Sequence, residues 1–184
     1  MVAIQLKRWT RQEYDRMIEA GVFSPGDRIQ LIEGEIIEMT PQNVLHAAGV
    51  RAAEEAMRRA FGDGFDIRVQ FPLALGRDSE PEPDVAVVPG HWRDYLTSHP
   101  ATAALVVEVS DSSLQFDRER KARIYARAGI REYWIVSLLD RVVEVYRDPT
   151  PNGGYATQNI VRAGESIQPL GRPTATIGAG ELLP

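Results

Sequence analysis

Apolar and polar residues follow helical spacing near the N-terminus and strand spacing through the middle of the chain. Thr10-Arg11-Gln12-Glu13 has the capping-box pattern, which predicts a helix over residues 10–20. Residues 43–61 are rich in Ala, Arg, Glu and Met, which favour helix, so they predict a second one. Between the two helices, residues 28–40 predict two short strands that turn at Glu33-Gly34.

Short apolar runs dominate the rest of the chain and predict strands. We expect strands over residues 65–75, with a bend at Pro72, and over 84–88, 105–110 and 132–137. Residues 117–128 predict a helix closed by Gly129, and residues 141–147 and 155–162 predict a hairpin. Because the helix at 117–128 joins two buried strands, these three elements should form a right-handed unit with parallel strands.

Together these elements predict an α/β fold, in which helices flank a mixed β-sheet and one hairpin is added near each end of the chain. We find no internal repeat and no linker long enough to divide domains, so we expect a single domain over residues 1–184.

Composition narrows the class of protein. The 184 residues are 43% hydrophobic and 26% charged, which is typical of a globular domain with its own core. Because the chain has no cysteine, disulfides and thiolate metal sites are excluded. Residues 1–9 lack the apolar stretch of a signal peptide, and no apolar run is long enough to span a bilayer. We therefore expect a cytoplasmic protein without a membrane partner.

The net charge of -5 counts against a protein that coats nucleic acid, because phosphate binding depends on clustered Lys and Arg. A local basic site beside an acidic centre stays compatible with this charge. Such a cluster is present at Arg118, Arg120, Lys121 and Arg123.

Two carboxylates stand inside apolar strands. In residues 105–110, alternation places Glu108 on the same face as Val106 and Ser110, and Asp84 begins the apolar run 84–88. An ionised carboxylate at such a position is costly unless it is paired or binds a metal. Two such acids on neighbouring strands would offer the oxygen ligands that suit Mg²⁺ or Mn²⁺.

Each candidate also has an ordinary explanation. Asp84 could be a turn residue where a strand begins, and Glu108 could pair with an arginine; the two acids together, beside a basic helix, favour the metal. Lys121 could orient water or stabilise a pentavalent phosphate, or could be an exposed helix lysine. His46 could bind the ion or position water, or could simply pack, and Gln70 could line the same cleft or face water.

The chain resembles the Uma2 family, also called DUF820, which is placed among the PD-(D/E)XK restriction-endonuclease-like nucleases. The resemblance covers nearly the whole chain. It is carried by Leu31-Ile32-Glu33-Gly34-Glu35-Ile36 with Met39, His46, Gln70, Glu80-Pro81-Glu82-Pro83-Asp84, Val106-Val107-Glu108-Val109-Ser110 and the block from Lys121 to Trp134.

The resemblance implies a restriction-endonuclease-like fold and assigns site residues. Pro83-Asp84 matches the Pro-Asp of the family, and Glu108 matches its second acid. The PD-(D/E)XK pattern has a lysine two residues after the second acid, where this chain has Ser110. In this family the lysine lies instead on the following helix, and Lys121 matches it. His46 falls where related nucleases often carry a glutamate, and relatives often have Glu in place of Gln30. The candidate supporting residues are Gln70, Glu35, Ser110 and Tyr125.

Two functions from different classes follow. The first is a Mg²⁺- or Mn²⁺-dependent endonuclease that hydrolyses DNA, or less favourably RNA, with Asp84, Glu108, Lys121 and His46 at its site. The second is a non-catalytic nucleic-acid-binding or assembly module that keeps the nuclease fold. A redox site built from His46 and the two acids has the right ligand types but no recognisable cosubstrate pocket. A homodimer would suit cleavage of a duplex and stays open.

Overall fold

The computed structural model describes residues 5–184, so Met1 to Ile4 of the predicted domain lie outside the described residues. The N-terminal part contains α1 (Arg11–Glu19), a hairpin of β1 (Ile29–Ile32) and β2 (Glu35–Glu38), and the long helix α2 (Val44–Phe61). The capping box at the start of α1 is formed, because the Thr10 hydroxyl accepts a hydrogen bond from the Glu13 N–H and the Glu13 carboxylate accepts one from the Thr10 N–H.

A six-stranded mixed sheet forms the centre of the fold. Its strands are β3 (Phe65–Val69), β4 (Val85–Pro89), β5 (Leu105–Ser110), β6 (Glu132–Ser137), β7 (Val142–Pro149) and β8 (Tyr155–Arg162), in spatial order β3-β4-β5-β6-β7-β8. Neighbouring strands are antiparallel except for β5 and β6, which are parallel as predicted. The mixed sheet, the parallel pair and both hairpins are confirmed.

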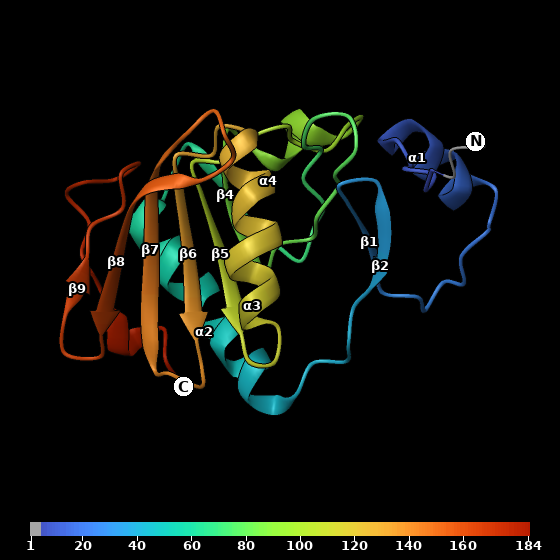
Figure 1. The fold of residues 1–184 in the computed structure, drawn as a ribbon. Helices are drawn as coiled ribbons and strands as arrows, with labels where there is room; N and C mark the ends of the chain where they lie inside the picture. The colour runs from blue at the N-terminus through green and yellow to red at the C-terminus, as the bar shows by residue number, and fades with distance from the viewer. Residues whose placement is uncertain (1–4) are drawn as a thin grey trace.

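Helices cover both faces of this sheet (Figure 1). On one face, α2 packs on β3, β4 and β5 around a core that includes Met57, Val107 and Trp134. On the other face lie α3 (Leu114–Phe116), a π-helical turn η2 (Asp117–Lys121) and α4 (Ala122–Arg127), which follow one another without a break. The remaining short elements are η1 (Trp92–Tyr95), β9 (Ser166–Ile167), β10 (Ile177–Gly178) and η3 (Ala179–Glu181).

The strand predicted over residues 65–75 is wrong beyond Val69. Gln70 has a φ of 55°, a left-handed conformation that ends β3 two residues before the bend expected at Pro72. Leu73 and Leu75 then leave the sheet and bury their side chains in a second hydrophobic core, which also contains Ile32 and Ala86. This left-handed turn places the Gln70 side chain where β3 ends, beside the start of β4.

The helix predicted over residues 117–128 begins earlier, at Leu114, and contains the π-helical turn. In this turn the Ala122 N–H donates to the carbonyl of Asp117, five residues back, which widens the helix locally. Across residues 5–184, the helices are too short or too polar to cross a membrane.

Candidate functional site

A pocket of about 280 Å³ opens where β5 ends, between the β1–β2 hairpin, the first turn of α2 and the turn η2. Its wall carries the carboxylates of Glu38, Glu82, Asp84, Glu108 and Asp117, the cations Arg28 and Lys121, and His46. Acidic groups therefore outnumber basic ones, so the pocket favours a cation over a free phosphate.

Asp84 lies just before β4 and is 7% exposed. Its Oδ2 accepts a hydrogen bond from the Val109 N–H at 2.8 Å, and its Oδ1 accepts one from Nε2 of Gln70 at 3.2 Å. Nε2 of His46 lies 3.3 Å from the same Oδ2. Burial opposes ionisation of this carboxyl, but the hydrogen bond from His46 and the charge of Lys121 outweigh it, so the pKa of Asp84 lies below its ordinary value.

Glu108 lies inside β5 and is 2% exposed. Its Oε2 accepts a hydrogen bond from the Asp84 N–H at 3.3 Å, so the two acids lie side by side at one end of the neighbouring strands β4 and β5 and line the same pocket. Its Oε1 accepts one from the Tyr125 hydroxyl at 2.6 Å and lies 2.9 Å from Nζ of Lys121. Burial raises the pKa of Glu108 to about 7, although Lys121 opposes this shift.

Lys121 is buried rather than exposed, with 6% of its surface accessible. Its ammonium lies 2.9 Å from Glu108 Oε1 and 3.7 Å from Asp117 Oδ1. Burial lowers the pKa of Lys121, but the two carboxylates outweigh burial and hold this pKa above its ordinary value. A lysine that stays charged cannot accept a proton at neutral pH, so Lys121 is suited to stabilising negative charge.

His46 is placed by the N-cap of α2, where the Asn43 side chain accepts a hydrogen bond from the His46 N–H at 2.9 Å. Burial lowers the pKa of His46, but the hydrogen bond to Asp84 outweighs this effect and raises it overall. Among the described residues, Nδ1 of His46 is buried without a hydrogen-bond partner. The histidine is thus anchored on Asp84 through Nε2, while its Nδ1 is enclosed and, within the described part of the chain, unpaired.

Glu35 and Ser110 lie outside the pocket wall. Glu35 pairs with Arg120 at 2.6 Å and also with Arg8, and Arg120 lowers the pKa of its carboxyl. Ser110 donates its hydroxyl hydrogen bond to Asp117 at 2.5 Å. By contrast, the other supporting candidates Gln70 and Tyr125 bind the two central acids directly.

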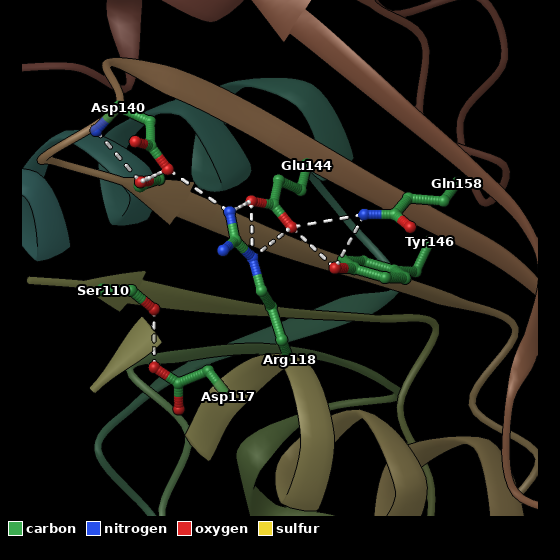
Figure 2. A network of polar contacts seen from close by, with 8 residues as sticks. Ser110, Asp117, Arg118, Asp140, Glu144, Tyr146 and Gln158 are labelled. Carbon is green, nitrogen blue, oxygen red and sulfur yellow. Dashed lines mark hydrogen bonds and ion pairs between the residues drawn. The ribbon is translucent and has the colours of Figure 1, made fainter. Parts of the chain in front are cut away.

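The arginines of the predicted basic cluster are paired within the chain. Arg118 binds Glu144 on β7, with Nε 3.0 Å from Oε1 (Figure 2). Arg120 and Arg123 both face Glu33 in the β1–β2 turn, at 3.4 and 3.7 Å. These contacts hold the hairpin against α4, so the cluster is not a free phosphate-binding surface, and only Lys121 faces the pocket.

Several pocket residues were not identified from the sequence as site residues, and Asp117, Glu82 and Gln30 are among them. Asp117 is 2% exposed, and Glu82 has a pKa raised by burial. Gln30, flagged only as a departure from the family, is 3% exposed and its Oε1 accepts a hydrogen bond from the Glu82 N–H at 3.4 Å. The spacing of Asp117 and Lys121, four residues apart on one helix, was the available signal for Asp117.

The donor set fits a hard divalent cation. Within residues 5–184, no three or more His, Cys, Asp or Glu side chains gather as a complete metal cage. Mg²⁺ does not need one, because it is usually held by one or two carboxylates and takes its other ligands from water and phosphate. Asp84 and Glu108, both buried and facing one acidic pocket, match that requirement.

Comparison with known proteins identifies the family and a solved structure with a similar fold. The family model Uma2, described as "Putative restriction endonuclease", matches residues 11–177. The fold is similar to the crystal structure of "a putative nuclease belonging to DUF820 from Anabaena variabilis ATCC 29413", with a TM-score of 0.72 and 14% identity over 94% of this chain and 96% of that chain. No curated protein matches the chain.

Proposed function

Because the chain belongs to the Uma2 family of restriction-endonuclease-like proteins, we propose that it is a metal-dependent endonuclease that hydrolyses phosphodiester bonds in DNA. One observation carries the proposal. The buried acids Asp84 and Glu108 line a single pocket, and the ammonium of Lys121 lies 2.9 Å from Glu108.

The chain's own residues would hold the metal ion and orient its ligands. Asp84 and Glu108 would hold the ion, and Tyr125, Gln70 and the backbone of β5 fix the orientation of both carboxylates. When bound, Mg²⁺ or Mn²⁺ would make water a stronger acid and neutralise charge that develops on the phosphate.

Lys121 and His46 would act on the substrate side. The ammonium of Lys121 stays protonated between two carboxylates and would stabilise the extra negative charge of a pentavalent phosphate. His46 favours the ionised form of Asp84 through Nε2 and, as part of the pocket wall, would position water. An acidic pocket repels a phosphate by itself, so substrate binding should depend on the metal.

A homodimer would suit a duplex substrate, because two pockets related by a two-fold axis can face the two strands. The edge strand β8 leaves a row of backbone groups available for pairing. Sedimentation with and without a duplex would test this, and a monomer under both conditions would contradict it.

The test of the proposed function combines metal binding and cleavage. We expect Mn²⁺ to bind wild type in calorimetry, and Asp84→Asn and Glu108→Gln to lose both this binding and Mg²⁺-dependent DNA cleavage with the fold intact. Glu144→Gln is the matched control, because Glu144 is also a buried carboxylate on the sheet but lies outside the pocket wall. A variant of either acid that cuts DNA at the wild-type rate would refute the assignment.

The alternative is a nucleic-acid-binding or assembly module that keeps the fold without turnover. The net charge of -5 and the pairing of the helix arginines favour it. It is also favoured by Ser110 and Gln30, which stand where the family resemblance implies a lysine and an acid. Absence of Mn²⁺ uptake by wild type in calorimetry would support this alternative, and metal uptake without cleavage of any DNA or RNA tested would leave a metal-binding scaffold.

A further inference from the structure

Asp117 is a buried carboxylate beside Lys121 to which the proposed chemistry assigns no role of its own. It begins the π-helical turn and is 2% exposed. Its Oδ2 accepts hydrogen bonds from the hydroxyls of Ser110, at 2.5 Å, and Ser113, at 2.6 Å. Figure 2 shows the first of these contacts, with Asp117 on the helix facing Ser110 at the end of β5. Two donors on one oxygen fix the orientation of the whole carboxylate.

The second oxygen of Asp117 faces the ammonium that the pocket depends on. Oδ1 lies 3.7 Å from Nζ of Lys121, which lies 2.9 Å from Glu108 on its other side. Both the lysine and Asp117 are nearly inaccessible to water, so their attraction is weakly screened. The ammonium is therefore held between one carboxylate from the helix and one from the sheet.

The backbone of the turn is anchored at the same residue. The carbonyl of Asp117 accepts a hydrogen bond from the Ala122 N–H and a second one from the hydroxyl of Tyr133, at 3.2 Å. The next residue, Arg118, points instead to Glu144 and Asp140 in a separate network (Figure 2). The two neighbouring residues therefore belong to different sets of contacts, which allows them to be tested separately.

We infer that Asp117 is a positioning residue for the proposed nuclease: held by the Ser110 and Ser113 hydroxyls, it aligns the ammonium of Lys121 toward the pocket. The inference rests on the proposed function for its catalytic consequence, but not for the placement of the lysine. It also gives Ser110 a defined task, because the hydroxyl at that position anchors the acid that aligns a lysine supplied by the helix.

A purely structural role for Asp117 makes different predictions. In that case the acid would only join the helix to β5, and its loss would lower the stability of the fold without a specific effect on Lys121. Glu144, another buried carboxylate bonded to the same helix, provides the matched case of such a role.

The first experiment observes Lys121 directly and needs no activity. The chain contains two lysines, Lys7 and Lys121, so selective ¹³C labelling of lysine gives two sets of Cε–Hε NMR signals. An ordered, buried lysine has two distinct Hε shifts, whereas a mobile one has nearly equal shifts. We expect Asp117→Asn to collapse this difference for Lys121 and leave Lys7 unchanged, and Glu144→Gln to leave both signals unchanged.

Ser113→Ala keeps the inference testable if Asp117→Asn does not fold. Ser113 is exposed and donates one of the two hydroxyl bonds, so its loss should shift the Lys121 signals in the same direction by a smaller amount. Unchanged Lys121 signals in a folded Asp117→Asn variant would overturn the inference. If that variant does not fold, unchanged signals in Ser113→Ala would overturn it.

The second experiment is a double-mutant cycle on cleavage. Asp117→Asn should lower kcat by about 10- to 100-fold with KM nearly unchanged, because a small displacement of a catalytic group has effects of that size. If Asp117 acts through Lys121, adding Asp117→Asn to Lys121→Met should cause no further loss. Additive losses would overturn the inference. Absence of cleavage by wild type would refute the proposed function instead, and the NMR experiment would still decide the role of Asp117.

Discussion

The ammonium of Lys121 lies 2.9 Å from Oε1 of Glu108, although the two residues come from a helix and from a strand on the sheet beneath it. This contact explains how a carboxylate persists in a strand whose neighbours are valines. It also means that a bound dication and the lysine would share one carboxylate.

Replacing this lysine should separate metal binding from catalysis. We expect Lys121→Met to lower kcat by about 100- to 1,000-fold, because a charge-stabilising donor is lost from the site. Mn²⁺ should bind as tightly as to wild type, or more tightly, because a cation that competes for Glu108 is removed. Calorimetry and single-turnover cleavage measure the two effects. Lys7→Met is the control, since Lys7 is exposed, and a tenfold weaker Mn²⁺ affinity in Lys121→Met would contradict the prediction.

Metal affinity should depend on pH through Glu108. Burial raises the pKa of this carboxyl to about 7, so below that pH a proton occupies the group that the ion needs. We expect the Mn²⁺ affinity to rise by up to about tenfold per pH unit as the pH approaches 7, and to level off above it. Titrations at a series of pH values test this. An affinity that is constant from pH 5.5 to 8 would argue against Glu108 as a ligand.

Gln70 combines a strained backbone with a bond to Asp84, and two substitutions separate these features. Gln70→Ala and Gln70→Gly both remove the 3.2 Å hydrogen bond, so they should reduce cleavage to a similar extent. Glycine tolerates the φ of 55°, so the Gly variant should be more stable than the Ala variant by about 1 kcal/mol. Denaturant unfolding measures the difference, and equal stabilities would contradict the strain argument.

Glu80 should make the fold less stable as the pH rises. Burial raises the pKa of this carboxyl to about 7, above the ordinary value of 4.5, and Arg11 at 3.7 Å only partly opposes the shift. Below about pH 4 the Glu80 carboxyl is protonated in both the folded and the unfolded chain. Between these pKa values the unfolded chain loses the proton while the folded one keeps it, so the free energy of unfolding falls.

Glu80→Gln removes this effect. At pH 8 we expect the variant to be more stable than wild type by about 1 kcal/mol, allowing for partial screening by solvent, and at pH 4 to match it. Unfolding curves at both pH values test this. Glu119→Gln, at an exposed position, should show no such difference. A Glu80→Gln variant less stable than wild type at pH 8 would contradict the prediction.

Local sequence predicted most elements and the two central acids. The capping box at Thr10, the helix α2 and the parallel pair β5–β6 follow from spacing and propensity, and the structure confirms them. The position of Glu108 among valines indicated a special carboxylate before its partners were known. The single domain over residues 1–184, the metal and the DNA substrate stay predictions.

Contacts between distant segments could not be predicted. From the sequence, the arginines of the basic cluster could have bound phosphate. In the fold, the β1–β2 turn brings Glu33 beside them, and Glu33 pairs with Arg120 and Arg123. Asp117 looked like an ordinary helix residue, and only its approach to Ser110 on β5 reveals its burial. The early end of β3 at Gln70 likewise depends on the loop that buries Leu73 in the second core.

The sequence by itself determined most of the elements, the family and the two buried acids, because periodicity and local motifs depend on residues close together in the chain. Tertiary structure decided which charges are free and which are neutralised. Electrostatic interactions in a dry interior depend on distances of a few ångströms, and such distances between a helix, a strand and a hairpin arise only when the sheet assembles.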